Sequence, residues 1–367
     1  MPHSPFEIES LAEFDTAVAS GSISGFRVQS VDLTDRTRLL LTADVHGAVF
    51  LGCPMAEEAA HRVQRDGALV FPTVPDLPFD PYRGTLYTPD ELFAGLADGY
   101  EQTPDARSYA WFRRTRAEHD IFAAVIRGMH DESMSNALDE RLRAGRPVVG
   151  VMGGHALERG GEDYAGAAGL GRALVRAGFD VATGGGPGAM EAANLGAYGA
   201  EFDDATLAEA VRMLGKAPSF TPSVAQWAQA AFAVRERWPG GGDSIGIPTW
   251  FYGHEPPNAF AGHIAKYFAN ALREDGLLAR STAGVVFLPG AAGTVQEIFD
   301  AATPNYYESH GAPRPMVLVG RGHWSARLPA WQLLSALASG RSMAPRIALV
   351  DSVDEAPEAL LRLGAAD

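Results

Sequence analysis

From Gly145 to the C-terminus, short apolar runs alternate with longer segments that carry apolar residues three and four positions apart. The longer segments are typical of amphipathic helices, and we expect one of them over residues 258–275. The short runs are apolar at almost every position, which indicates strands buried on both faces of a parallel sheet. We therefore predict an α/β fold over residues 141–367, with a doubly wound, Rossmann-like and mostly parallel sheet. The apolar runs are PVVGVMGG, DVATGG, SIGIPTWFYG, AGVVFLPG, PMVLVG and RIALV.

Residues 1–140 show a different pattern. Short runs typical of strands alternate with turns and a proline-rich connection, and the stretch 105–145 has helical spacing of its apolar residues. We predict a smaller, mixed α+β accessory domain in this region, with a regulatory or oligomerisation role. No internal repeat of fixed period is apparent along the chain.

Composition and charge indicate which kinds of partner and which cellular location to expect. The net charge of -15 argues against a nucleic-acid partner, because the phosphates of a nucleic acid attract positively charged proteins. No apolar run approaches the roughly 18 residues that span a bilayer, so no membrane association is expected. Cys53 is the only cysteine, which excludes an intrachain disulfide framework, and the acidic N-terminus is unlike a secretion signal. We expect a cytoplasmic protein.

Three predicted strands end in glycine-rich turns: residues 153–155, 184–190 and 289–294. Ligands of doubly wound sheets bind at the carboxyl ends of the strands, and glycine turns entering helices favour anions. Three such turns predict one anionic ligand. The second turn also fits the G-x-G-x-x-A dinucleotide fingerprint, but it follows the second strand and no acidic strand end follows it. An NAD(P)-dependent oxidoreductase is therefore a weaker interpretation, and a glycine turn without any ligand remains an alternative.

The stretch PGAAGTVQE, residues 289–297, allows two interpretations. Thr294 and Glu297 fit the T-x-x-E capping box of an ordinary helix start. Alternatively, the small residues before Thr294 leave room for an anion on the backbone amides. In that case Glu297 would lie in the first helical turn, where the helix dipole favours its charged form.

Several motifs resemble those of a known family. PGAAGTVQE is similar to the PGGxGTxxE signature of the LOG (Lonely Guy) family, whose members are often labelled lysine decarboxylases. GGGPGAM, residues 184–190, resembles the second glycine motif of that family. HEPPNAF, residues 254–260, is similar to an E-P-P-N element of its bacterial pyrimidine/purine nucleotide 5′-monophosphate nucleosidase branch. The resemblance spans about residues 146–320.

The resemblance implies hydrolysis of the N-glycosidic bond of nucleoside 5′-monophosphates to free base and ribose 5-phosphate, without a cofactor. Glu297 is the implied catalytic carboxylate. The family also implies a homo-oligomer, and an alarmone is a candidate effector. The residues implied for phosphate and ribose are Gly185, Gly186, Gly188, Met190, Gly290, Ala291, Ala292, Gly293 and Thr294. The candidates for sugar and base are Gly154, His155, Glu255 and Asn258.

The chain departs from the family pattern at two places. Ala291 replaces a signature glycine, and the position of the family's catalytic arginine falls on Glu274. Arg273 is the adjacent candidate, and Arg280 is a second one. These departures keep open a non-catalytic nucleotide- or molybdenum-cofactor-binding protein of the same fold. The histidines lack metal-site spacing, and neither Lys216 nor Lys266 is predicted to lie in a pocket, so we expect neither a metal site nor lysine decarboxylation.

Overall fold

The computed structural model describes residues 7–143, 145–252, 255–309 and 311–365. The chain forms two compact units. The first comprises Met1–Thr85 with Asp120–Ala137, and the second comprises Leu86–His119 with Leu138–Asp367. Helix α6 (Ile121–Arg143) contributes to both units. Within the described ranges, no helix combines the length and the apolar character needed to cross a membrane.

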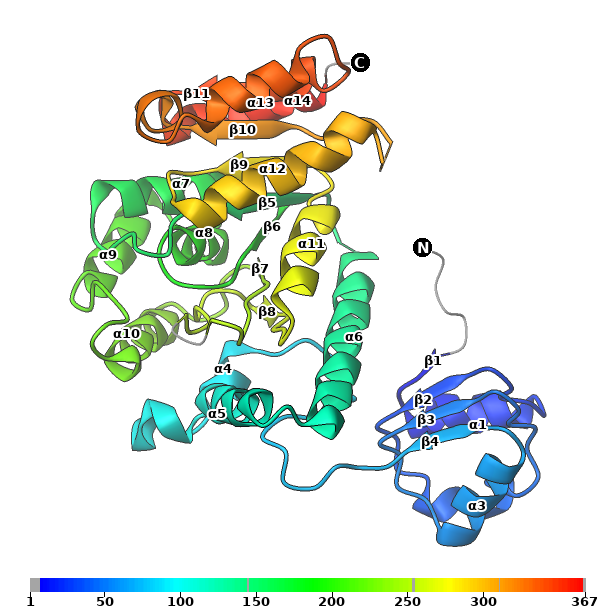
Figure 1. The fold of residues 1–367 in the computed structure, drawn as a ribbon. Helices are drawn as coiled ribbons and strands as arrows, with labels where there is room; N and C mark the ends of the chain where they lie inside the picture. Colours follow the sequence, from blue (N-terminus) through cyan, green and yellow to red (C-terminus); the bar gives the residue numbers. More distant parts are fainter. Residues whose placement is uncertain (1–6, 144, 253–254, 310, 366–367) are drawn as a thin grey trace. The chain divides into compact units, whose positions relative to one another are not determined.

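The second unit is built on a seven-stranded sheet in which each strand runs parallel to its neighbours (Figure 1). The predicted doubly wound α/β fold is therefore confirmed. The strand order is β11-β10-β9-β5-β6-β7-β8. The strands are β5 (Val148–Met152), β6 (Asp180–Thr183), β7 (Ile245–Gly246), β8 (His263–Ile264), β9 (Gly284–Phe287), β10 (Met316–Val319) and β11 (Ile347–Val350).

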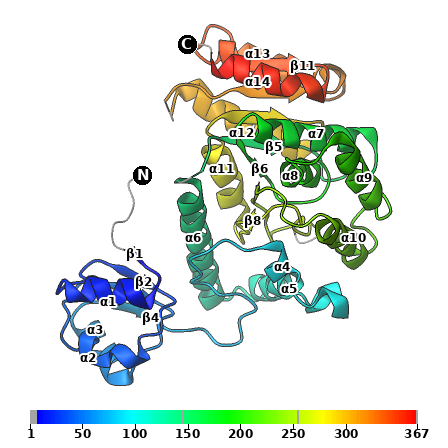
Figure 2. The ribbon, with the colours of Figure 1, turned by 180° about the vertical axis from the view of Figure 1, so that it is seen from behind.

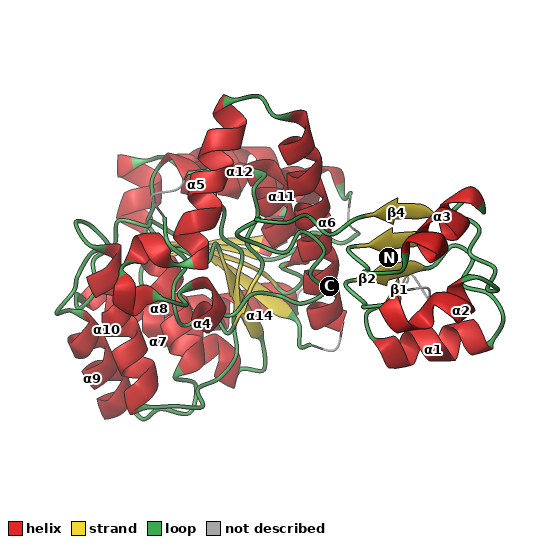
Figure 3. Ribbon diagram, turned by 90° about the horizontal axis from the view of Figure 1, so that it is seen from below, coloured by secondary structure: helices red, strands yellow, loops and turns green. Residues whose placement is uncertain are grey.

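Helices cover both faces of this sheet (Figure 3). One face carries α7 (Glu162–Arg176), α8 (Ala189–Tyr198) and α14 (Ala356–Gly364). The other carries α11 (Asn270–Arg280), α12 (Ala292–Tyr307) and α13 (Ala330–Ala338). The remaining helices of the unit are α4 (Pro89–Leu92), α5 (Pro104–Ala117), α9 (Asp204–Leu214) and α10 (Val224–Arg237). The central strands β5, β6, β9 and β10 are buried at every residue, which agrees with their continuous apolar runs.

The chain reverses its direction of travel across the sheet between β5 and β9. It proceeds from β5 outward through β6, β7 and β8, then returns to place β9 on the other side of β5. Such a topological switch point is the usual ligand site of a doubly wound sheet. The reversal also makes β9, β5 and β6 direct neighbours, so the three predicted glycine turns follow adjacent strands.

The helix expected over residues 258–275 is wrong in its first half. Residues 263 and 264 form strand β8, and α11 begins only at Asn270. Ile264 exchanges two backbone hydrogen bonds with Tyr87, of 2.9 and 2.8 Å, and also pairs with Gly246 of β7. These partners lie far away in the sequence, so the helical spacing of the apolar residues was outweighed by pairing that no local pattern reveals.

The first unit contains a second parallel sheet, with the order β1-β2-β3-β4. Its strands are β1 (Glu7–Ile8), β2 (Arg27–Gln29), β3 (Val49–Leu51) and β4 (Leu69–Phe71). Helices α1 (Leu11–Ala19), α2 (Thr37–Leu40) and α3 (Glu57–Arg65) lie on one side of it (Figure 2). Ile8, Val28 and Phe50 align across the strands and are buried in one core with Phe14 of α1.

This unit is built from an internal repeat that is not apparent in the sequence. Glu7, Arg27, Val49 and Leu69 lie in one row across the sheet, at intervals of 20, 22 and 20 residues. The three later strands each follow a left-handed glycine by two residues: Gly25, Gly47 and Gly67. Repeats of this length stack their strands and helices into a solenoid. The interval varies and α2 is only one turn long, so little more than glycine and apolar positions recurs in the sequence.

Candidate active site

The structure brings the three glycine turns into direct backbone contact. The amide of Gly154 donates to the carbonyl of Pro289 at 3.2 Å, and the amide of Ala189 donates to the carbonyl of Gly154 at 3.1 Å. A Cβ on Gly188 would lie only 2.4 Å from the Gly154 carbonyl oxygen, so this contact requires a glycine. The turns that follow β5, β6 and β9 therefore surround one location at the switch point.

Helix α12 begins at Ala292 and directs its first amides toward this location. Within residues 255–309, the first amide of the helix with a backbone acceptor is that of Val295, which donates to Ala291 at 3.0 Å. The preceding amides are the unsatisfied donors of a helix N-terminus, which suit an anion. Thr294 is buried, and its hydroxyl lies against Gly290.

The predicted capping box at this helix start is not formed. The N-cap residue is Ala291, without a side-chain cap, and Glu297 is the sixth residue of the helix. Glu297 thus lies in the second turn, not the first as expected, because the small residues before Thr294 are already helical. Ala291 has φ of −118°, which any residue can adopt, so its replacement of the family glycine does not strain the turn.

Arg273 of α11 reaches Glu297. Its Nη1 atom lies 3.5 Å from Glu297 Oε1, and its Nε donates to the carbonyl of Ile247 at 2.9 Å. The two side chains are only 9% and 13% exposed. Arg280, the second candidate, instead bonds Asp139 at 2.8 Å. Of the two arginines suggested by the sequence, the fold brings Arg273 to the carboxylate.

Burial raises the pKa of Glu297 from 4.5 to about 7. The positive charge of Arg273 opposes this shift, and the carboxylates of Glu274 and Glu255 add to it. The expectation that the helix dipole would keep Glu297 charged is therefore corrected, because the residue is one turn too far along the helix. A carboxylate with a pKa near neutrality suits proton transfer.

Gly184 provides the space that Arg273 occupies. A Cβ at this position would lie 2.2 Å from Arg273 Nη2 and 2.6 Å from the sulfur of Met190. In the sequence, Gly184 is the first glycine of the G-x-G-x-x-A fingerprint, and this pattern predicts no individual role for it. Its proximity to Arg273 could not be inferred, because the arginine is 89 positions later in the chain.

The variant Gly184→Ala is expected to displace the Arg273 guanidinium from Glu297 while the protein stays folded. Both atoms that the new methyl group would meet belong to flexible side chains. Turnover should fall by about 10²-fold, in line with a small misplacement of a catalytic group. The matched control is Gly169→Ala in α7, where a Cβ meets no atom within 4 Å. Equal turnover of the two variants would contradict this role of Gly184.

Asn258 forms a hydrogen bond with the glycine turn of residues 184–190. Its Nδ2 donates to the carbonyl of Gly186 at 3.1 Å and to Asn194 Oδ1 at 2.9 Å. Its Oδ1 accepts from the amides of Phe260 and Ala261. The side chain is fully buried and its hydrogen-bonding groups are engaged within the protein, while its contact with sugar or base stays a prediction.

His155 and Glu255 lie at the rim of the turns. His155 Nδ1 is 3.2 Å from Glu255 Oε1. A Cβ on Gly186 would lie 3.0 Å from the Met190 methyl group and 3.6 Å from Glu255 Oε2, which places Met190 and Glu255 beside this turn. His254, the first residue of the HEPPNAF motif, lies outside the described residues.

Part of the chain is similar in sequence to a known protein family. Residues 228–363 match the family model described as "Possible lysine decarboxylase". The match includes α11, α12 and the Arg273–Glu297 pair, and it supports a LOG-like family for this part of the chain. None of the curated protein sequences matches this chain.

Solved structures with some similarity include two molybdenum-cofactor proteins. The molybdenum cofactor binding protein from Rippkaea orientalis has 18% identity and a TM-score of 0.38, covering 59% of this chain and 97% of its own. The molybdenum cofactor carrier protein from Chlamydomonas reinhardtii has 19% identity and a TM-score of 0.37, covering 60% of this chain and 99% of its own. Similarity at this level does not indicate a shared ligand.

The two lysines of the chain, Lys216 and Lys266, lie in different environments. Lys216 is exposed, whereas Lys266 is 1% exposed and lies just after β8, not on a helix. Lys266 Nζ contacts Asp105 Oδ1 at 2.6 Å, and Asp105 also accepts from Trp250 and Tyr100, both at 2.8 Å. Burial lowers the pKa of Lys266, while Asp105 and Glu255 oppose that shift. The Lys266–Asp105 ion pair therefore connects α5 to the segment that follows the edge strand β8.

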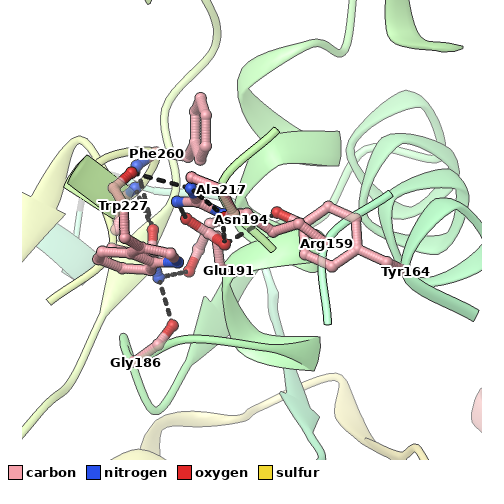
Figure 4. A network of polar contacts seen from close by, with 10 residues as sticks. Arg159, Tyr164, Gly186, Glu191, Asn194, Ala217, Trp227 and Phe260 are labelled. Carbon is pink, nitrogen blue, oxygen red and sulfur yellow. Dashed lines mark hydrogen bonds and ion pairs between the residues drawn. The ribbon is translucent and has the colours of Figure 1, made fainter. Parts of the chain in front are cut away.

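A second buried ion pair holds the turn after β5. Arg159 donates to both oxygens of Glu191, at 2.7 and 2.5 Å, and Tyr164 donates to the same carboxylate at 3.0 Å (Figure 4). Arg159 also donates to the carbonyl of Trp227 at 2.8 Å and lies over its ring. This network fixes the segment that carries Gly154 and His155 onto the start of α8.

Two large cavities of the described residues lie away from the glycine turns. A cavity of about 520 Å³ is lined by residues of α11, of α12 and of the segment that leads into β10, including Asp275, Asp300 and Arg314. Another of about 580 Å³ lies in the first unit beside Ser30 and Tyr82. A small one of about 20 Å³ touches His155 and Gly188. Within the same residues, no group of three or more His, Cys, Asp or Glu side chains is arranged to hold a metal.

Proposed function

We propose that this protein hydrolyses the N-glycosidic bond of nucleoside 5′-monophosphates and releases free base and ribose 5-phosphate. The observation that carries the proposal is the buried Arg273–Glu297 pair, which lies beside the N-terminus of α12 and three glycine turns. The LOG-like match of residues 228–363 supports the same class of reaction.

The anionic end of the substrate would lie at the start of α12. The amides of residues 291–294 and the hydroxyl of Thr294 would donate to the 5′-phosphate, and the positive end of the helix dipole favours its charge. The turn of Gly185, Gly186 and Gly188, with Met190, would then contact the ribose.

Glu297 is assigned the proton transfer. Cleavage of the C1′–N bond passes through an oxocarbenium-like transition state, as in glycoside hydrolysis. Ionised Glu297 would stabilise that charge and accept a proton from the water that attacks C1′. Arg273 would hold the carboxylate in place through the 3.5 Å contact and limit the cost of its ionisation.

Incubation of the purified protein with AMP, GMP, CMP, UMP and IMP tests the proposal, with release of ribose 5-phosphate as the measurement. We expect cleavage of at least one nucleotide, and loss of cleavage in the Glu297→Gln variant. If several nucleotides raise the melting temperature but none is cleaved, the protein is a nucleotide-binding protein and the proposed activity is wrong.

The pH dependence follows from the raised pKa of Glu297. The reaction needs the ionised carboxylate, so the acidic limb of the kcat/KM profile should rise as the pH increases through about 7. Two nucleotides with different bases should give the same acidic limb, because the titrating group belongs to the protein. An acidic limb near the ordinary value of 4.5 would show that Glu297 is not the group that must lose its proton.

A further inference from the structure

His155 and Glu255 form a pair that the reaction described so far does not use. His155 follows β5, Glu255 lies between β7 and β8, and the fold brings His155 Nδ1 to 3.2 Å from Glu255 Oε1. The His155 side chain is 47% exposed, whereas that of Glu255 is 19% exposed. The imidazole is therefore accessible to a ligand, and the carboxylate that orients it is mostly covered.

The pair shares its location with the proposed ribose site. A Cβ on Gly188 would lie 2.7 Å from the backbone carbonyl oxygen of His155, so the histidine backbone packs against the ribose turn. Glu255 lies beside Gly186 in the same turn. The charge of Glu255 also contributes to the raised pKa of Glu297, which indicates that both carboxylates belong to one site.

The reaction requires a proton for the departing base, and the Arg273–Glu297 pair does not supply it. When the C1′–N bond breaks, its electron pair moves to the base nitrogen, and a neutral base leaves more easily than an anion. An arginine side chain is a poor proton donor, because a guanidinium stays charged in proteins. Glu297 must be ionised to accept a proton from water. A histidine is suited to donate one, because its ordinary pKa lies near neutrality.

We propose that His155 is the general acid that protonates the departing base, and that Glu255 is the positioning residue that orients its imidazole. This inference rests on the proposed nucleosidase function. The C1′–N bond breaks as a proton moves from His155 to a ring nitrogen of the base. The water oxygen bonds to C1′, and its proton moves to Glu297. His155 regains a proton from solvent and Glu297 loses one to it, which restores the protein.

Two substrates with different leaving groups test this role. AMP needs protonation of its base, whereas 4-nitrophenyl β-D-ribofuranoside 5-phosphate releases a phenolate that is stable without a proton. For His155→Gln, we expect kcat with AMP to fall by about 10²-fold or more, and kcat with the nitrophenyl substrate to fall by less than about 3-fold. Glu255→Gln should show a smaller loss with the same preference for AMP.

The matched control is His263→Gln. His263 also faces a carboxylate, with Nε2 at 3.4 Å from Asp243, but it lies on the edge strand β8. This variant should cleave both substrates at the wild-type rate. If His155→Gln lowers kcat equally with both substrates, His155 is a positioning residue and not the general acid. If it lowers kcat with neither substrate, His155 takes no part in the reaction. Wild-type protein that cleaves neither substrate would instead overturn the proposed function itself.

Discussion

The Glu297→Gln variant is expected to lose turnover by about 10²–10⁴-fold and, at pH 8, to be more stable than the wild-type protein. Glutamine has nearly the same shape and can still accept a hydrogen bond from Arg273. It cannot take a proton from water or balance positive charge on the ribose. The measurements are kcat with AMP and the melting temperature at pH 5 and pH 8.

The sign of the stability change follows from the pKa of Glu297. Its pKa in the folded protein, about 7, is above the ordinary value of 4.5, so the folded state binds the proton more tightly than the unfolded state. This contribution to stability is fully present below pH 4.5 and is lost as the pH rises through about 7. Above that pH, the ionised buried carboxylate costs about 3 kcal/mol relative to an unperturbed one.

Glutamine does not titrate, so its variant avoids this cost. At pH 8 the variant should melt several degrees above the wild-type protein, and at pH 5 the two should melt close together. The control is Glu236→Gln, an exposed position on α10, which should change neither turnover nor melting temperature. If Glu297→Gln destabilises the protein at pH 8, the ionised carboxylate is stabilising and its pKa is not raised.

Replacement of Arg159 is expected to give the largest loss of stability. Arg159→Ala leaves the carboxylate of Glu191 buried with Tyr164 as its remaining side-chain partner and removes the donor to the Trp227 carbonyl. Breaking a buried ion pair in this way costs about 3–5 kcal/mol. The free energy of unfolding, measured from denaturant midpoints, should fall by that amount. Because Arg159 also holds the segment that carries His155, turnover should be lost at lower temperatures than in the wild-type protein.

An exposed ion pair provides the comparison for Arg159. Arg212 and Glu209 lie 3.5 Å apart on the surface of α9, and Arg212→Ala should cost less than about 1 kcal/mol. The double variant Arg159→Met with Glu191→Leu should recover part of the lost stability, since no buried charge is left without its partner. If Arg159→Ala and Arg212→Ala unfold at the same denaturant concentration, the buried pair does not stabilise the fold.

Features that depend on local pattern were predictable from the sequence. The continuous apolar runs indicated parallel strands buried on both sides, and the glycine turns marked the strand ends that meet at the switch point. Glu297 and Arg273 could each be proposed as catalytic residues because a family motif carries the first and the second is adjacent to the expected position. The structure then places them 3.5 Å apart.

Features that depend on distant partners were not predictable. Strand β8 forms because Ile264 bonds Tyr87 and Gly246, and the amine of Lys266 is buried because Asp105 lies 161 positions earlier. The pKa of Glu297 depends on burial and on charges from helix α11 and from the segment between β7 and β8, so a helix-dipole argument gave the wrong direction. The repeat in the first unit was not detected because little more than glycine and apolar positions recurs in its sequence, at intervals that vary between 20 and 22 residues.

The most direct test of the central claim is a crystal structure of the Glu297→Gln variant soaked with AMP. The predicted result is intact AMP with its 5′-phosphate on the amides of residues 291–294 and C1′ facing the side chain at position 297. AMP bound instead in the cavity lined by Asp275, Asp300 and Arg314, or beside Ser30 and Tyr82, would contradict the assignment of the site.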